Sequence, residues 1–333
     1  MDFSLTTEQE SLREVARRFL ASEYPTRRII AGDAGPAAFA DAARLGWFDP
    51  EVGMVERALL AEEAGYALLP GAWWITLALP ESLPARPVAW ARGDFTARAA
   101  AGDWLLDGHG YVDRVNGGVL VSTDDGLFTV DADQPGVTRT DMAGIDTLRP
   151  GAELRCAGAA AVRLLEPAAA RSVVAAARLR ERALLAAEAV GVARHAYDVA
   201  VAHARTRQQF GRPIGAFQAV AFAIADSYVR LELARSLAYR AAWLVGAADP
   251  GADLAVVSAL ICARQAAVAA TEQALQCLGG LGMTWEHPLH HWYRRALWLD
   301  NRDRSTDAHL EAIAAALFCP IDFDSTMEPV RET

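Results

Sequence analysis

The hydrophobic positions of the first 80 or so residues recur at the three- and four-residue spacing of amphipathic helices. The opening segment LTTEQESLREVARRFL contains a capping-box pattern, Thr7 followed three residues later by Glu10. Its apolar side chains share one helical face: Leu12, Val15, Ala16, Phe19 and Leu20. Shorter helical patterns cover about 37–45 and 52–64, and a glycine directly follows each. We therefore expect an N-terminal α-helical domain over residues 1–84.

The hydrophobic period changes between about residues 85 and 165. Apolar runs become short, and turn dipeptides such as Asp107-Gly108, Gly117-Gly118 and Asp125-Gly126 separate them. The segment VLVSTDDGLFTVDA has the pattern of a β-hairpin. These features predict a small middle β domain over residues 85–167.

Residues 168–333 return to a helical pattern. Long alanine-rich segments cover about 172–204, 213–245 and 253–278. The second carries one apolar stripe: Phe217, Val220, Ala221, Ile224, Tyr228 and Leu231. Small side chains let long helices approach one another closely, so we expect a C-terminal antiparallel four-helix bundle. The whole chain is predicted to be α+β, and the lack of strand–helix alternation argues against a doubly wound dinucleotide-binding sheet.

Composition narrows the classes of function. The 333 residues are 53% hydrophobic and 22% charged, which is typical of a folded chain with a sizeable core. All 32 basic residues are arginines, and the net charge of -10 argues against a broad nucleic-acid surface. One local arginine site for a phosphate-bearing cofactor remains compatible with this charge.

Location and redox state are also predicted from composition. The weakly polar stretch Ala67–Pro80 is shorter than the roughly 20 residues that a spanning helix needs, so no membrane span is expected. The first residues lack the pattern of a signal peptide, which predicts a cytoplasmic protein. The four cysteines are widely spaced and are expected to be reduced, mostly buried thiols: Cys156, Cys262, Cys277 and Cys319.

Two segments carry candidate binding chemistry. RTRQQFGRPIGAFQA, residues 205–219, lies between two long helices and concentrates Arg205, Arg207 and Arg212 there. Arginines at a helix end can simply complement the helix dipole, but guanidinium groups also bind pyrophosphate oxygens. QCLGGLGMTWEH, residues 276–287, ends the third long helix with glycines that permit a ligand to approach the backbone closely.

Taken together, RxxFG followed by Q, QxLGGxG about 60 residues later and an N-terminal LTxEQ helix resemble the acyl-CoA dehydrogenase family over nearly the whole chain. The resemblance implies FAD as cofactor, an acyl-CoA or other acyl thioester as substrate, and electron-transfer flavoprotein or a similar acceptor as partner. It also implies that six residues bind the ADP half of an FAD held mainly by a neighbouring subunit of an oligomer: Arg207, Phe210, Gln218, Gln276, Gly279 and Gly280.

The family implies a glutamate that removes the α proton of the thioester while the β hydrogen leaves as hydride, and two positions compete for this role. In RLRERALLAAEAVG, Glu181 matches the register of the less common family site. In LDNRDRST, Asp303 stands at the commoner site, as a shorter carboxylate followed by Arg304. Glu181 is therefore the preferred base and Asp303 the alternative. Glu188 is expected to be structural.

The flavin-ring loop TExxxGSD and the WxT strand that the family usually carries are not visible. The residues offered to a neighbour's FAD are kept while those for the chain's own flavin are degraded. The chain thus resembles the shorter subunits of heterotetrameric bacterial acyl-CoA dehydrogenases. Two functions stay open: a dehydrogenase subunit with its own base, and a catalytically silent subunit that completes a partner's FAD site. The acyl group and its carrier also stay open.

The remaining histidine and tryptophan candidates are expected to have structural roles. His287, His290 and His291 lack a carboxylate or cysteine at convincing spacing, so no metal site is predicted. Trp73 and Trp74 are expected to be buried core.

Overall fold

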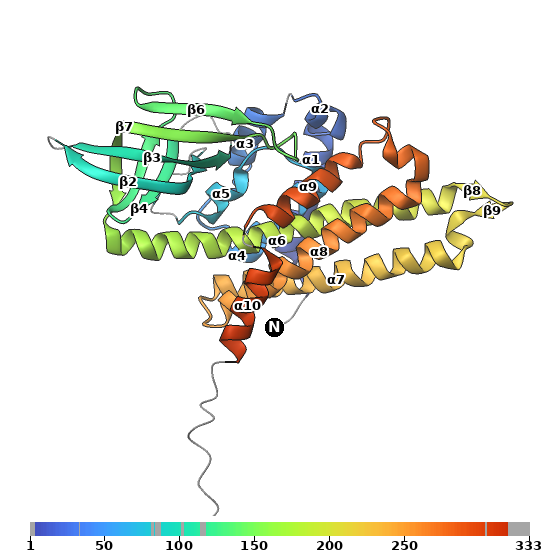
Figure 1. Cartoon of the computed structure of the whole chain (residues 1–333). Coiled ribbons are helices and arrows are strands. Elements are labelled where there is room, and N and C mark those ends of the chain that lie inside the picture. Colours follow the sequence, from blue (N-terminus) through green and yellow to red (C-terminus); the bar gives the residue numbers. More distant parts are fainter. Residues whose placement is uncertain are drawn as a thin grey trace, which may run out of the picture.

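The computed structural model describes residues 4–318, except residues 33, 81–82, 84–87, 101–102, 114–117 and 304. The chain runs from N-terminal helices through a sheet to a helical bundle, which confirms the predicted α+β order (Figure 1). The N-terminal helices are α1 (Thr7–Glu23), α2 (Thr26–Ile30), α3 (Gly35–Arg44), α4 (Met54–Ala67) and α5 (Trp73–Ala78). The short elements α2 and α5 were not predicted from the sequence.

The described part of the middle unit contains seven strands: β1 (Val88–Trp90), β2 (Arg92–Ala100), β3 (Asp103–Asp113), β4 (Gly118–Thr123), β5 (Gly126–Asp131), β6 (Val137–Met142) and β7 (Gly151–Leu165). They form one sheet in the order β1-β4-β5-β7-β3-β2, with β6 also paired to β7. The predicted hairpin is confirmed as β4 and β5, which pair antiparallel up to Thr123 and Gly126. Alternate side chains point to opposite faces of a strand, and Leu106, Phe128 and Leu154 fill the sheet's own core.

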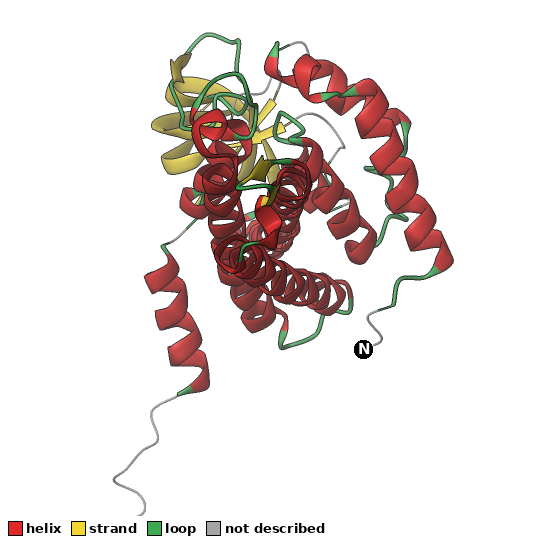
Figure 2. Cartoon of the chain, turned by 90° about the vertical axis from the view of Figure 1, so that its right-hand side faces the viewer, coloured by secondary structure: helices red, strands yellow, loops and turns green. Residues whose placement is uncertain are grey.

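The C-terminal unit contains α6 (Pro167–Thr206), α7 (Gln218–Gly246), α8 (Ala252–Leu278), α9 (His290–Asn301) and α10 (Thr306–Leu317). Between α6 and α7 lie the short strands β8 (Gln208–Gln209) and β9 (Arg212–Pro213) and the 3-10 turn η1 (Ile214–Ala216); η2 (Gly279–Met283) follows α8. Helices α6, α7 and α8 run side by side, and α10 stands away from the rest at its free end (Figures 1 and 2).

The N-terminal helices and the bundle share one continuous hydrophobic core, which includes Leu60 and Leu184. Two glycines let the backbones of α4 and α6 approach each other. A Cβ atom at Gly65 would lie 2.2 Å from the backbone oxygen of Glu188, and one at Gly191 would lie 2.0 Å from that of Glu62. The sequence pattern predicted that α4 ends before Gly65, and this is wrong, because the helix continues to Ala67. Gly65 lies inside the helix at a position where the backbone of α6 leaves no room for a side chain.

The N-terminus of α1 also differs from its prediction. The capping box is formed by Thr6 and Gln9, whose side chains each bond the other's backbone N–H, and not by Thr7 and Glu10. Both pairs have the same spacing of hydroxyl and long polar side chain. The extended backbone of Thr6, with ψ at 163°, puts the cap one residue earlier.

Helix α8 is more apolar than the Ala67–Pro80 stretch on which the absence of a membrane span was predicted. Residues Ala252–Met283 are long and hydrophobic enough to cross a membrane by length and composition alone, but 61% of their most apolar window is buried inside the protein. The core helix of a soluble protein meets the same criterion, so this stretch is weak grounds for a span.

Three of the cysteines lie in the described part of the chain, and all three are free thiols there: Cys156 is buried, and Cys262 and Cys277 are half-buried. Burial, with a smaller contribution from Asp107, raises the pKa of the Cys156 thiol to about 11. Cys319 lies outside the described residues.

A buried ionic network joins the loop before β7 to the bundle. Glu188 on α6 accepts hydrogen bonds from Arg149 at 2.6 and 3.1 Å and from Arg295 on α9 at 2.8 Å. Arg295 also pairs with Asp146 and donates to the backbone oxygen of Leu69 just after α4. The Arg149 guanidinium lies 4.1 Å from the centre of the Trp74 ring, so Trp74 is core as predicted but carries a cation on its face.

A second network fastens α4 to the helices around it. Glu63 is bonded by Arg17 of α1 and Arg194 of α6, and Glu62 by Arg194, Arg235 and Tyr239. Both carboxylates are only 1% exposed. Burial acts to raise the pKa of Glu63, and the hydrogen bonds from Arg194 and Arg17 outweigh it, so that its pKa is lowered.

Replacing Glu188 with glutamine should destabilise the fold strongly. The variant leaves the positive charges of Arg149 and Arg295 buried without their shared carboxylate, and breaking a buried pair in this way costs about 3–5 kcal/mol. The measurement is urea unfolding followed by circular dichroism, with the exposed Glu51→Gln as the matched control. An equal, small effect of the two changes would contradict the assigned role of the network.

Acid should weaken the contact between α6 and α9. His195 stacks on Trp292 with 3.7 Å between ring centroids, and burial, then the charges of His287 and Arg194, lowers its pKa to about 3. The unfolded chain, with a histidine pKa near 6.5, therefore binds this proton first as pH falls. The stability that the neutral His195 contributes is fully present above about pH 6.5 and is lost progressively toward pH 3.

His195→Phe, which keeps an aromatic ring and removes the titration, should reduce the pH slope of the unfolding free energy in that window by up to about 1.4 kcal/mol per pH unit. Urea titrations at pH 7, 6, 5 and 4 measure the slope, and the exposed His109→Phe is the control. An unchanged slope in His195→Phe would refute this assignment.

Candidate functional site

Glu181 lies on α6, where its side chain turns toward the sheet and the N-terminal helices. It is only 7% exposed, so it does not belong to a solvated helix end. Its Oε1 accepts a hydrogen bond from Arg92 Nη2 at 2.5 Å and one from Trp74 Nε1 at 3.3 Å. Arg302 Nη2 lies 3.7 Å from the same oxygen. The preferred base candidate is therefore a buried carboxylate held by two guanidinium groups and an indole.

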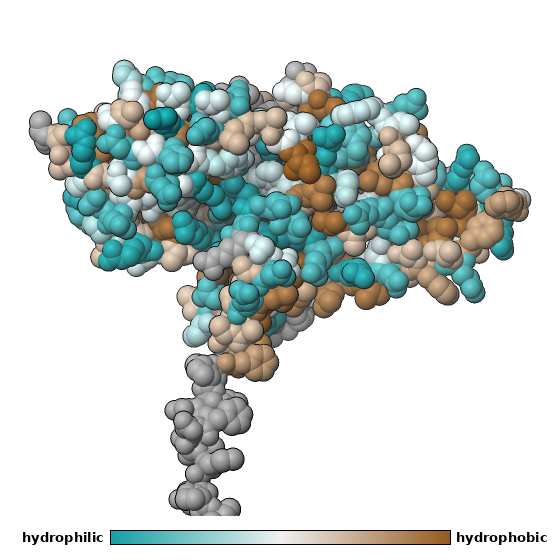
Figure 3. Space-filling view, in the orientation of Figure 1, coloured by the Kyte–Doolittle hydropathy of each residue, from teal (hydrophilic) through white to brown (hydrophobic). Residues whose placement is uncertain are grey.

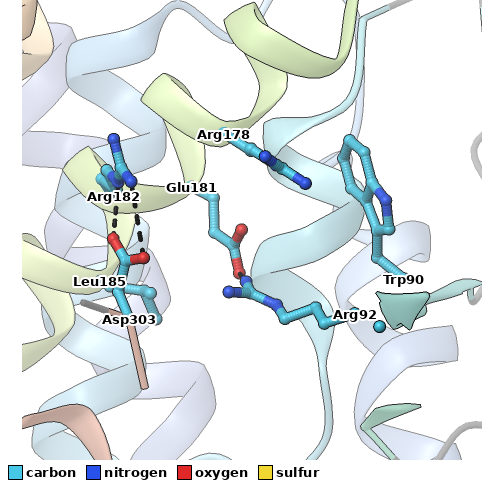
Figure 4. A pocket seen from close by; sticks show the side chains of 8 residues that line it. Trp90, Arg92, Arg178, Glu181, Arg182, Leu185 and Asp303 are labelled. Carbon is cyan, nitrogen blue, oxygen red and sulfur yellow. Dashed lines mark hydrogen bonds and ion pairs between the residues drawn. The ribbon is translucent and has the colours of Figure 1, made fainter. Parts of the chain in front are cut away.

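A cavity of about 270 Å³ lies beside this carboxylate (Figure 4). We call it the arginine pocket, and its lining residues are Trp90, Arg92, Gly93, Arg178, Glu181, Arg182, Leu185 and Asp303. Three cations and two carboxylates dominate the lining, whereas most small-molecule sites are largely apolar with few polar groups. The pocket is thus built mainly from charged pairs.

Asp303, the alternative base, lies in the same pocket. Arg182 Nε donates to its Oδ2 at 2.6 Å, and His309 Nε2 lies 3.6 Å from that oxygen. The structure therefore brings the two candidate carboxylates to one cavity, each beside an arginine. Arg304, which follows Asp303, lies outside the described residues.

The wall behind Glu181 is aromatic and cationic. Arg302 is paired with Asp113 and lies 5.1 Å from the ring centre of Trp298, which meets Trp74 edge-on at 5.4 Å. On the neighbouring helix, burial lowers the pKa of the Arg264 guanidinium. These contacts hold the Glu181 side of the pocket in place.

Sequence reasoning missed Arg92 and Arg302. Arg92 begins β2, pairs in register with Tyr111, and reaches Glu181 across 89 positions of sequence. No spacing rule connects a strand start to a helix position so far away. The sequence did show that the usual flavin-ring loop is missing, but not that an arginine would contact the base candidate.

The six residues implied for ADP binding gather at the opposite end of the bundle. We call them the ADP face: Arg207, Phe210, Gln218, Gln276, Gly279 and Gly280, all exposed. Their closeness follows from the packing of α6 and α8, since Cys277 Sγ lies 3.7 Å from the backbone oxygen of Ala200. A Cβ atom at Gly279 or Gly280 would meet nothing within 4 Å, so the backbone is open to a ligand there.

The β8–β9 hairpin presents Phe210, which is 91% exposed and has a positive φ of 52°. Its ring meets Phe217 edge-on at 6.1 Å, and the Arg212 guanidinium lies 4.1 Å from the centre of Phe217. Hydrophobic side chains show at this end and along the edge formed by α7 (Figure 3). A large apolar ring held outward in an unusual backbone conformation is typical of a contact residue.

His287, His290 and His291 lie near η2 and α9. Their surroundings are aromatic: the rings of His290 and His291 are 4.1 Å apart, and Trp285 lies 4.4 Å from His290. Burial, then the charge of His290, lowers the pKa of His291 to about 4. Among the described residues no group of three or more histidine, cysteine or acidic side chains could hold a metal.

The fold and these segments agree with the comparisons to known proteins. The family model "Acyl-CoA dehydrogenase, C-terminal domain" matches residues 172–318. Acyl-CoA dehydrogenase FadE34 of Mycobacterium tuberculosis is 34% identical over 330 residues, covering 88% of this chain and 45% of FadE34. Acyl-CoA dehydrogenase IpdE2 of the same species is 29% identical over 273 residues, covering 81% of this chain and 79% of IpdE2.

Among solved structures, a variant of the Tcur3481-Tcur3483 steroid ACAD superposes with a TM-score of 0.81 and 23% identity, covering 93% of this chain and 97% of that one. The chain spans less than half the length of FadE34. The architecture is the acyl-CoA dehydrogenase fold. The chain belongs to the acyl-CoA dehydrogenase family, whose cofactor is FAD.

The two ends of the molecule fit FAD unequally. At the ADP face, exposed donors and open glycine backbone are suited to a pyrophosphate and its neighbouring groups. In the arginine pocket, the Arg92–Glu181 pair lies within a cavity of only about 270 Å³, and three arginines line it. The residues present therefore fit the ADP half of FAD at the bundle end and do not fit a flavin ring in the pocket.

Proposed function

We propose that this chain is the cofactor-completing subunit of a mixed acyl-CoA dehydrogenase. It presents the ADP face to an FAD held mainly by a longer partner subunit, and the partner supplies the base that acts on the acyl thioester. The single observation that carries this proposal is the ion pair between Arg92 and Glu181 inside the arginine pocket.

The ion pair counts against Glu181 as a working base. A general base must lie within hydrogen-bond reach of the substrate proton and must be able to accept it. One oxygen of Glu181, Oε1, already accepts from Arg92 and Trp74, with Arg302 beside it. A substrate could reach this carboxylate only if Arg92 left it, and separating a largely buried ion pair is expensive.

The ADP face is suited to a neighbour's cofactor. In the proposed assembly Arg207 meets the pyrophosphate, Phe210 and Gln218 lie beside it, and the segment with Gln276, Gly279 and Gly280 contacts the rest of the ADP half. Bound FAD supplies the hydride acceptor for α,β-dehydrogenation of the thioester. This chain's own residues orient the cofactor and shield it from water, and electrons leave to electron-transfer flavoprotein or a similar acceptor.

Helix α7 offers a surface on which a partner can bind. Phe222, Val229, Leu233 and Trp243 recur at helical spacing along it and are 44–64% exposed. Exposed apolar rows of this kind mark subunit contacts. The stripe predicted from the sequence lies beside this row, and within it Leu231 is buried and Tyr228 is 48% exposed.

Two of the similar proteins support an assembly of two unlike units. FadE34 is more than twice as long as the part that this chain matches, which leaves room for a second unit of similar size. The Tcur3481-Tcur3483 steroid ACAD carries two component names. We take a steroid-like or other bulky acyl thioester as the substrate class of the proposed assembly.

A second candidate function keeps Glu181 as the base of a site on this chain. The burial of Glu181 and its place in the wall of a cavity favour this alternative, because a surface charge would need only water around it. In that case Arg92 must leave the carboxylate before the substrate binds. The two candidates differ in whether the isolated chain holds flavin and whether Glu181 matters for turnover.

The flavin spectrum tests the first difference. The chain purified alone should be colourless, and the same chain co-expressed with its longer partner should be yellow.

In the assembly Arg207→Ala should weaken FAD retention by about ten- to a hundredfold, because a charge-assisted hydrogen bond worth about 1.5–3 kcal/mol is lost. Exposed Arg155→Ala is the control. A yellow isolated chain, or unchanged FAD affinity in Arg207→Ala, would overturn the proposal.

Turnover of Glu181→Gln tests the second difference. The glutamine keeps the shape of the side chain and cannot act as a base. In the proposed assembly turnover should stay at the wild-type level, whereas a catalytic Glu181 predicts a loss of roughly 10² to 10⁴. The measurement is steady-state reduction of an electron acceptor with acyl-CoA, with FAD content determined for each preparation. A large loss at full FAD content would establish the second candidate.

A further inference from the structure

The arginine pocket has one more cation than its carboxylates balance. Arg92 is paired with Glu181, and Arg182 with Asp303. Arg178, the third arginine of the lining, has no ion pair or hydrogen bond through its side chain within the described part of the chain. This local excess of positive charge occurs in a protein whose net charge is -10.

The free cation points into the cavity. In Figure 4 the guanidinium of Arg178 extends over the space between the Trp90 ring and the Arg92–Glu181 pair. The Arg92 side chain is 34% exposed, so a solute can reach its guanidinium while the pair with Glu181 stays formed. Trp90 is 6% exposed and gives the cavity an apolar wall. Two donors and an aromatic face thus surround one space.

We propose that the arginine pocket binds a short-chain carboxylate, with its anionic group between Arg178 and Arg92 and its carbon chain against Trp90. A guanidinium matches a carboxylate through two parallel hydrogen bonds, which gives both charge and geometry. The volume of about 270 Å³ lies just below the range of drug-sized sites, about 300–1,000 Å³, and suits an acid of a few carbons. This inference rests on the proposed function in one respect, that no flavin ring occupies the pocket.

The test uses the flavin-free chain of 333 residues and two matched probes, butyrate and its neutral isostere butyramide. Isothermal titration at constant ionic strength should show saturable binding of butyrate and much weaker binding of butyramide. Arg178→Gln should weaken butyrate binding by about tenfold or more, since it removes a charge-assisted contact. Arg171→Gln is the control, because Arg171 is an exposed arginine two turns earlier on α6 and outside the pocket.

Three results would overturn the inference: no saturable butyrate binding, equal binding of butyrate and butyramide, or wild-type binding by Arg178→Gln. These outcomes are separate from those of the proposed function. A chain that is yellow when purified alone overturns the proposed function. A colourless chain that does not bind butyrate overturns only the proposal of a carboxylate site. Circular dichroism of Arg178→Gln, an exposed position, checks that the variant is folded.

Discussion

The buried carboxylate of Glu188 is the interaction on which the arrangement of the molecule depends. It is fully buried and shared by Arg149, from the loop before β7, and by Arg295, from α9. Charged groups taken out of water are stable only when they are paired and hydrogen-bonded. The sheet, the end of α4, α6 and α9 must therefore meet in one geometry. Because α6 carries Glu181 two turns before Glu188, this geometry also determines where the arginine pocket forms.

The two glutamates show how neighbouring positions of one helix face acquire different environments. Glu188 lies where the sheet, the N-terminal helices and the bundle all meet, and its partners are themselves buried. Glu181 lies nearer the start of α6, where the sheet edge leaves a cavity, and its partner Arg92 is still 34% exposed. Burial of the partner thus separates a structural carboxylate from one that a ligand can approach. The helix period alone places both on the same side.

The sequence was sufficient for the features that depend on local periodicity. The long helices, the β4–β5 hairpin and the order of the three regions followed from hydrophobic spacing and turn residues, and the exposed ends of α6 and α8 followed from their glycines and arginines. Contacts between residues far apart in the sequence could not be predicted from spacing. Arg92 meets Glu181 only because the sheet packs against α6, and Gly65 looked like a helix end because the backbone of α6 that excludes its side chain is distant in sequence. The three-domain division stays a prediction, since one core joins the N-terminal helices to the bundle.

The length of α6 has a consequence for how cofactor contacts can be divided. Glu181 and Arg207 are 26 positions apart along this single helix and its cap, which at a rise of 1.5 Å per residue puts them about 39 Å from each other. This span is several times the reach of the ribityl chain between a flavin ring and its pyrophosphate. One dinucleotide cannot touch both places on the same copy of the chain. The forty-residue length of α6 therefore separates the two places: an FAD whose pyrophosphate meets Arg207 cannot place its ring in the arginine pocket of the same chain.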